Sequence, residues 1–224
     1  MNTLHTFGCS LTASTDWPDM LARKMKLSLS NHAVPAGDNI TQVRRFKDHV
    51  LKNEINEHDL VIWEVTYLNR LGFRLSQDHH FYTANRYNEK VNHNFHLTTK
   101  NIVDEKQHID YVAFNKDWYD VNWYVQNIGE MLSDLLFAIK TANEMTKGCL
   151  VWFADNNIFE DRLTKENFIN FLQQNQINTV GYESAIMSWT RDNNFAMAPD
   201  GMHPASDVYR RYAETILEPR LIQL

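Results

Sequence analysis

Two short apolar runs, residues 60–65 and 148–153, constrain the fold of this chain more than any other feature. Both are dominated by large apolar side chains and show little alternation with polar residues. This pattern is typical of a strand that is buried on both faces of a parallel sheet. Three other segments have strand character: residues 3–8, 27–33 and, more weakly, 177–181. The sequence therefore predicts a parallel sheet in which these two runs are buried strands.

Helical patterns lie between the expected strands. Asp16 and Pro18 suit the start of a helix that runs to Met25, because Asp caps helices and proline fits the first turn. Apolar residues recur at helical spacing over approximately residues 40–51, 121–145 and 204–217. The alternation of strands and helices indicates an α/β architecture with right-handed crossovers. A length of 224 residues fits a single domain, 1–224.

Several polar segments directly follow expected strands. They are Ser10, residues 37–39, residues 66–70 and residues 154–157. In an open α/β sheet the functional loops lie outside the carboxyl ends of the strands. We therefore expect these four segments to share one edge of the sheet.

Residues 71–120 interrupt the α/β pattern and are expected to form an insertion. The stretch is rich in Asn, His, Tyr and Asp and has no strong periodicity. An ordered surface insertion is one interpretation, and a wall or lid over the strand ends, including His80, Tyr82, Trp118 or Tyr119, is the other. Its histidines lack the spacing of a known zinc site, so we expect no metal, and nothing implies a cofactor.

Ser10 and the Asp200–His203 pair suggest nucleophilic chemistry. Ser10 stands at the tip of a small-residue turn after the first strand, and Asp200 precedes His203 by three residues in a loop before the last helix. A serine hydroxyl needs a base to take its proton, and the base needs a third group to orient it. The alternatives are structural: Ser10 as a turn or helix cap, and the Asp-x-x-His segment as a cap before Pro204.

The order of these motifs resembles that of the SGNH hydrolases, also called the GDSL esterase and lipase superfamily. The segment Phe7-Gly8-Cys9-Ser10-Leu11-Thr12 is similar to the first block of that family, with Cys9 in place of an Asp. Gly37 fits the second block, and Asp200-Gly201-Met202-His203 closely matches the last. The resemblance implies a flavodoxin-like three-layer α/β/α fold over nearly the whole chain, with 71–120 as the insertion.

The resemblance also implies roles for these residues. Ser10 would be the nucleophile, His203 the base and Asp200 its orienting group, and the amides of Ser10 and Gly37 would hold the oxyanion. The third block of the family, Gly-x-Asn-Asp, is absent from the expected position. Glu64 replaces the Gly, so Thr66 or, with a longer turn, Asn69 would donate the missing hydrogen bond.

The expected reaction is hydrolysis of an ester through an acyl-enzyme intermediate. The resemblance suggests a small acyl group, such as an O-acetyl group on a carbohydrate. Two alternatives stay open: a binding protein without turnover on the same fold, and an acyltransferase in which a second alcohol replaces water.

The charge and hydropathy of the chain limit the kinds of partner that it is expected to bind. The net charge of -6 argues against nucleic acid, because phosphate contacts need clustered Lys and Arg. No apolar run approaches the roughly 20 residues that span a bilayer, so no membrane association is expected. No segment has the pattern of a secretory signal, and Cys9 and Cys149 are expected to be buried thiols, which favours the reducing cytoplasm. The oligomeric state is not predicted.

Overall fold

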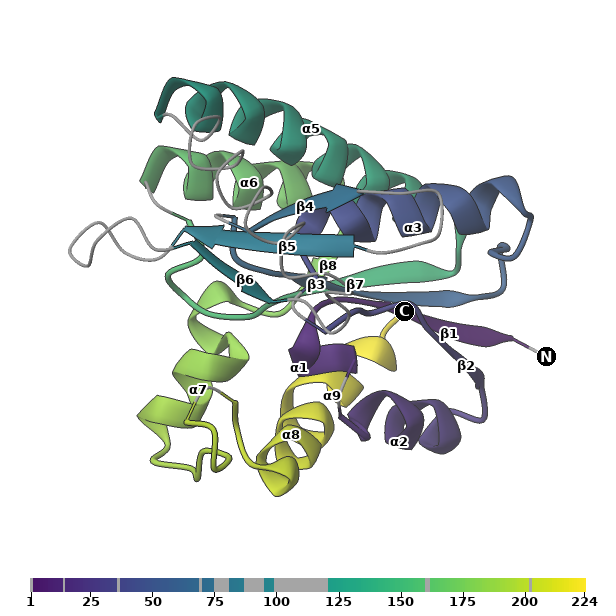
Figure 1. Cartoon of the computed structure of the whole chain (residues 1–224). Coiled ribbons are helices and arrows are strands. Elements are labelled where there is room, and N and C mark those ends of the chain that lie inside the picture. Colours follow the sequence, from purple (N-terminus) through teal and green to yellow (C-terminus); the bar gives the residue numbers. More distant parts are fainter. Residues whose placement is uncertain are drawn as a thin grey trace.

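A parallel five-stranded sheet forms the centre of the computed structural model (Figure 1). The structure describes residues 2–13, 15–35, 37–68, 70–74, 81–86, 95–98, 121–159, 162–201 and 203–224, and within 70–127 the description is of the backbone. The strand order is β2 (Ser28–Asn31), β1 (Thr3–Phe7), β3 (Leu60–Val65), β7 (Gly148–Phe153) and β8 (Asn178–Thr179). All neighbouring strands pair in parallel, so the predicted sheet is confirmed.

The two apolar runs are the central strands β3 and β7. Every residue of both strands is buried, and their register pairs Leu60 with Gly148 and Val65 with Phe153. Burial on both faces explains why the runs do not alternate between apolar and polar residues.

Helices cover both faces of the sheet and complete three layers (Figure 1). One layer contains α3 (Asn39–Leu51), α5 (Val121–Met145) and α6 (Arg162–Gln174). The other contains α1 (Ser10–Ala13), α2 (Trp17–Lys24), α8 (Ser206–Tyr212) and α9 (Glu218–Leu221). The short η1 (Tyr182–Ser184) and α7 (Ile186–Asp192) follow β8. This arrangement is the predicted α/β/α sandwich.

Two details of the helices differ from expectation. Asp16 precedes α2, but its side chain makes no cap hydrogen bond and instead accepts one from Arg210 Nε at 2.8 Å. The last helix is also interrupted, because a π-helical turn, η2 (Ala213–Leu217), separates α8 from α9. A π-turn adds a residue to the helical repeat and shifts the face that the following turn presents.

Part of the segment 71–120 forms a second sheet. Strands β4 (Arg70–Arg74), β5 (Phe81–Arg86) and β6 (Phe95–Thr98) pair in antiparallel order β4-β5-β6, and β4 lies against α3. The sequence showed no periodicity there, so these strands were not foreseen. His80, Trp118 and Tyr119 lie outside the described residues, and the role of the segment as a wall of the site stays a prediction.

None of the helices in the described part of the chain is both long and apolar enough to cross a membrane.

Candidate active site

Ser10 stands directly above the carboxyl end of β1. The strand ends at Phe7, Gly8 and Cys9 form the turn, and Ser10 is the first residue of α1. The amides of Thr12 and Ala13 donate to the Cys9 carbonyl at 3.1 and 2.8 Å, which closes the helical turn. The Ser10 amide belongs to the start of this helix, where N–H groups have no intrahelical acceptor.

The loop before α8 holds the carboxylate and the imidazole. Gly201 has φ +66°, and the Ala198 amide donates to the His203 carbonyl at 2.7 Å, so the loop folds back on itself. Asp200 Oδ1 accepts the His203 amide at 3.0 Å, and Asp200 Oδ2 lies 2.6 Å from His203 Nδ1. Both carboxylate oxygens therefore orient His203.

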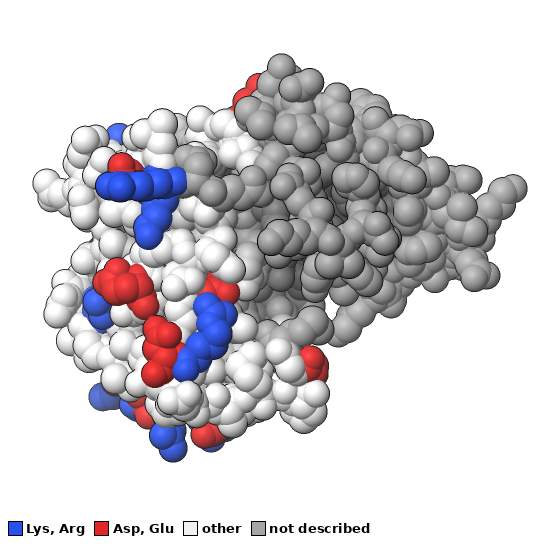
Figure 2. Space-filling view, turned by 90° about the vertical axis from the view of Figure 1, so that its left-hand side faces the viewer, with Lys and Arg blue, Asp and Glu red and all other residues white. Residues whose placement is uncertain are grey.

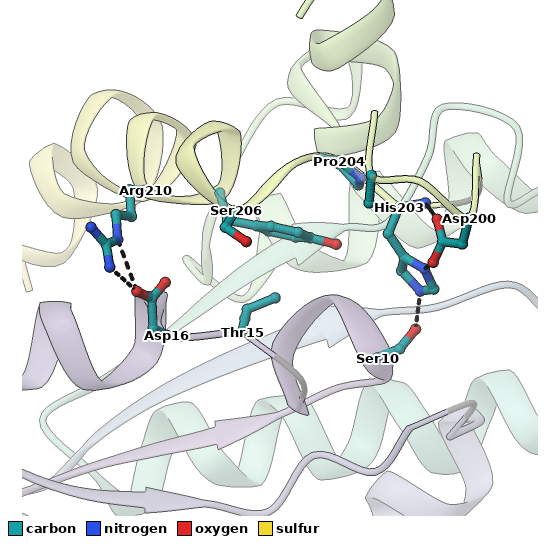
Figure 3. Close-up of a pocket in the computed structure, with 10 residues that line it drawn as sticks. Ser10, Thr15, Asp16, Asp200, His203, Pro204, Ser206 and Arg210 are labelled. Atoms are coloured by element: carbon teal, nitrogen blue, oxygen red, sulfur yellow. Dashed lines mark hydrogen bonds and ion pairs between the residues drawn. The ribbon is translucent and has the colours of Figure 1, made fainter. Parts of the chain in front are cut away.

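The two ends of the chain meet at this edge of the sheet (Figure 3). Ser10 Oγ lies 2.8 Å from His203 Nε2, within normal hydrogen-bond distance. Because ionised Asp200 can only accept, Nδ1 carries the proton of the neutral ring and Nε2 is left to accept from the serine. A hydroxyl, an imidazole and a carboxylate thus form one continuous chain of hydrogen bonds.

A pocket of about 630 Å³ opens beside these residues. Its far wall is made by Thr15 and Asp16 from the segment before α2 and by Ser206 and Arg210 from α8 (Figure 3). The hydrogen bond from Arg210 holds the pKa of Asp16 below its ordinary value. Most of the side chains that line the described pocket are polar.

The sequence matches no protein-family model and no curated protein. Among solved structures, a member of the lipolytic protein G-D-S-L family from Veillonella parvula is similar, with a TM-score of 0.52, 10% identity, and coverage of 96% of this chain and 95% of that one. The structure of TesA is similar at a TM-score of 0.50 and 12% identity, with coverage of 95% and 94%. The Bacillus subtilis protein YXIM is similar at a TM-score of 0.55 and 10% identity, over 99% of this chain and 56% of that one.

This chain has the fold of the SGNH hydrolases. The sequence predicts that the loops after β1, β2 and β3 share one edge of the sheet. Contacts among Gly8, Gly37, Asn39 and Thr66 place these three loops next to one another. A Cβ on Gly37 would lie 3.2 Å from the Gly8 carbonyl oxygen and 2.8 Å from that of Val34, so only a glycine fits there without movement. Asn39 Nδ2 donates to the Thr66 carbonyl at 3.0 Å, and Asn39 Oδ1 accepts the Thr66 amide at 3.1 Å.

The oxyanion donors expected from the sequence are less complete in the structure than the hydrogen-bonded chain of Ser10, His203 and Asp200. The Gly37 amide donates to the Val34 carbonyl at 2.8 Å, so it must turn to reach a ligand. The Thr66 side chain is fully buried and does not line the pocket. Asn69 lies outside the described residues. The oxyanion roles of Gly37, Thr66 and Asn69 stay predictions.

Tyr209 is a pocket residue that the sequence analysis missed. It follows Ser206 by one helical turn on α8, and it lines the pocket while only 4% of its surface is exposed. Among the described residues, its hydroxyl group has no hydrogen-bond partner. Burial raises the pKa of Tyr209, which keeps the phenol protonated and able to donate. Its place in the first turns of the expected last helix, shortly after the Asp-x-x-His motif, was the available signal.

Glu64 is the second residue whose place was not foreseen. The sequence analysis treated it only as a replacement for a glycine. The structure places its carboxylate under the Ser10 turn, where Oε2 accepts from the Cys9 amide at 2.9 Å and from Thr12 Oγ1 at 2.6 Å. Gly8 allows this approach, because a Cβ there would lie 2.3 Å from Glu64 Oε2 and 2.5 Å from Thr12 Oγ1.

We therefore expect Gly8→Ala to destabilise the protein by about 1–3 kcal/mol, the usual cost of forcing extra atoms into a packed site. The measurement is urea unfolding followed by tryptophan fluorescence. Gly129→Ala is the matched control, because a Cβ at Gly129 on α5 meets nothing within 4 Å. That variant should be more stable by up to about 1 kcal/mol, the helix-propensity difference. Equal stabilities for the two variants would contradict the close packing of Gly8.

The described residues include no group of three or more His, Cys, Asp or Glu side chains that could hold a metal ion. Cys9 and Cys149 are both buried and do not form a disulfide with each other, which agrees with the prediction of buried thiols.

Proposed function

We propose that this protein is a serine hydrolase that cleaves an ester through an acyl-enzyme intermediate. The observation that carries the proposal is the hydrogen-bonded chain from Ser10 through His203 to Asp200, with distances of 2.8 and 2.6 Å. The fold supports it, because the similar structure from Veillonella parvula is described as that of a lipolytic G-D-S-L protein.

The chemistry follows from the positions of the three side chains. Ser10 Oγ attacks the ester carbonyl carbon while His203 Nε2 takes the hydroxyl proton, and the carbonyl oxygen becomes an oxyanion. Collapse of this intermediate breaks the bond to the leaving alcohol, which departs with the proton from His203. A water molecule then repeats the sequence on the acyl-serine, which releases the acid and restores Ser10. Asp200 stabilises the imidazolium in both halves and keeps its own charge.

The pocket favours a small acyl group and a polar alcohol. The walls beyond Ser10 carry the hydroxyls of Thr15 and Ser206 and the Asp16–Arg210 ion pair. A long alkyl chain would bury these groups without hydrogen bonds, which costs free energy. An O-acetyl group on a carbohydrate has the required chemistry, and it is the substrate class that we propose.

The face of the molecule shown in Figure 2 gives no support to a polyanionic partner. On the face shown in Figure 2, Lys and Arg side chains lie beside Asp and Glu side chains rather than in a continuous basic patch. This mixture agrees with the proposal of a small-molecule or glycan ester as the ligand.

The proposed function is tested by a fluorophosphonate probe, which phosphonylates an activated serine hydroxyl with loss of fluoride. We expect one adduct, and peptide mass spectrometry should locate it on Ser10. Labelling of another residue would overturn the assignment of the nucleophile. A wild-type protein that neither reacts with the probe nor turns over short-chain esters would favour a binding protein on this fold.

We expect Tyr209→Phe to lower kcat/KM for an acetylated carbohydrate by about 5- to 50-fold, because a lost hydrogen bond to a bound ligand costs roughly 1–2 kcal/mol. The free protein should not lose stability, because the Tyr209 hydroxyl has no partner among the described residues. Steady-state kinetics and thermal unfolding of the same preparations measure both effects. If stability falls while kcat/KM stays unchanged, the hydroxyl serves the fold rather than the ligand.

A further inference from the structure

Glu64 is a buried acidic residue in the middle of an apolar strand. It lies on β3 between Trp63 and Val65, and its own exposure is 0%. Burying a carboxylate costs free energy unless hydrogen bonds replace its lost hydration. An apolar residue would be the ordinary occupant of such a position on a central parallel strand. The contacts of the Glu64 carboxyl group must therefore account for its burial at this position.

Three hydrogen bonds to Glu64 come from the turn that carries Ser10. Oε1 accepts from Cys9 Sγ at 2.7 Å, and Oε2 accepts from the Cys9 amide at 2.9 Å and from Thr12 Oγ1 at 2.6 Å. Cys9 precedes Ser10 and Thr12 lies two residues after it, so the carboxylate binds the turn on both sides of the nucleophile. Three donors of the turn thus converge on the two carboxyl oxygens of Glu64.

These contacts define the orientation of the Ser10 backbone. The Cys9 amide points down toward β3, and the Cys9 carbonyl accepts the amides of Thr12 and Ala13. Glu64 thus holds the peptide unit between Gly8 and Cys9 through its N–H, and the start of α1 holds the next peptide unit, between Cys9 and Ser10, through its carbonyl. Its N–H, the Ser10 amide, is the donor that the proposed reaction places on the oxyanion.

We infer that Glu64 is a positioning residue for the nucleophile: it holds the Cys9–Thr12 turn so that Ser10 Oγ stays on His203 Nε2 and the Ser10 amide stays turned to the reacting carbonyl. The inference rests on the proposed function, because it assigns Glu64 a role in the reactivity of Ser10. In this inference Glu64 acts on the reaction through the turn, as a positioning residue rather than a catalytic one.

Glu64→Gln is the first test, because glutamine keeps the size of the side chain but replaces one acceptor by an NH₂ group. We expect the second-order rate of fluorophosphonate labelling and kcat for an ester to fall about tenfold or more, since small displacements of reacting groups are costly in rate. KM should stay near the wild-type value, because the pocket walls of α8 do not change.

Thr12 provides a second test that leaves Glu64 in place. Thr12→Val removes one donor at nearly constant volume, and Thr12→Ser keeps the hydroxyl. We expect labelling of the valine variant to be several-fold slower and that of the serine variant to be close to wild type. Because Glu64 and Thr12 share one hydrogen bond, the effects of Glu64→Gln and Thr12→Val should not be additive.

Asp59→Asn is the matched control. Asp59 is also buried, accepts the amides of Thr3 and Asn56 at 2.7 and 2.9 Å, and lies just before β3 at the far end of that strand. This variant should lose stability but label at the wild-type rate once the folded fraction, measured by thermal unfolding, is taken into account.

The outcomes separate the two proposals. An unreactive wild-type protein overturns the proposed function and this inference with it. A reactive wild type together with a Glu64→Gln variant that labels equally fast, or loses rate only in proportion to its unfolded fraction, overturns the role of Glu64 and leaves the proposed function intact. If Glu64→Gln does not fold, the Thr12 pair decides, and equal labelling of the valine and serine variants overturns the inference.

Discussion

Ser10→Ala is expected to lower kcat for a short-chain ester such as nitrophenyl acetate by about 10⁴- to 10⁶-fold, because it removes the nucleophile. The fold should survive. Ser10 is half-buried at a turn, and loss of one oxygen there opens no cavity in the apolar core. The measurement is steady-state hydrolysis at saturating ester, together with thermal unfolding of the same preparation.

His203→Ala should be almost as damaging, and the double variant should be no worse than either single one. The serine and the imidazole act as one unit, since Ser10 Oγ lies 2.8 Å from His203 Nε2 and neither group activates the ester alone. Asp200→Asn should have a milder effect if the contact to the His203 amide still orients the ring.

Ser133→Ala is the control for the serine substitution. Ser133 is an exposed residue of α5 whose hydroxyl donates to the Gly129 carbonyl at 2.9 Å, far from the described pocket. It should hydrolyse esters at the wild-type rate. A Ser10→Ala protein that keeps the wild-type rate on every ester tried would show that the nucleophile is another residue.

Acidification is expected to destabilise the fold through a group of buried histidines. His5 Nδ1 lies 2.9 Å from His32 Nε2, and His5 Nε2 lies 3.3 Å from Asp59 Oδ2. The ring of His32 also stacks on Phe7, with centroids 4.7 Å apart, and contacts the ring of His49 at 3.8 Å. Burial, reinforced by the neighbouring histidines, lowers the pKa of His32 to about 3, and burial also lowers the pKa of His5.

The direction of the pH effect follows from these shifts. A histidine of the unfolded chain takes up a proton near pH 6.5, whereas His32 in the folded protein does so only near pH 3. Between these values the unfolded state binds more protons, so the free energy of unfolding decreases as the pH falls. For His32 alone the loss between pH 7.5 and pH 5 is about 2 kcal/mol, and His5 adds to it in the same direction.

Urea unfolding at pH 7.5 and pH 5 measures this loss. His32→Gln should be less stable at pH 7.5 but should show a smaller decrease toward pH 5, because one titrating group is gone. His58→Gln is the control, since the His58 side chain is 70% exposed and should leave the pH dependence unchanged. A free energy of unfolding that does not change between the two pH values would contradict the burial of neutral histidines.

Local pattern in the sequence was sufficient for much of the architecture. The runs 60–65 and 148–153 coincide with β3 and β7, and the apolar spacing over 121–145 coincides with α5. These elements follow from side-chain periodicity, which depends on near neighbours in the chain. Ser10, Asp200 and His203 could be singled out because each lies in a short recognisable motif. Ser10 and His203 are 193 positions apart in the sequence, however, and only the tertiary fold brings them together.

The roles of Asp16 and Glu64 escaped the sequence analysis because their partners lie far away in the chain. Asp16 has the sequence of a helix cap, yet its carboxylate binds Arg210, which the packing of α8 against α2 brings near. Glu64 stands among apolar strand residues, and only the parallel pairing of β1 with β3 places it beneath Cys9. Strand and helix periodicity records which face of an element is buried. It does not record which polar group of another element will contact that buried face. In this protein the tertiary packing decided those contacts.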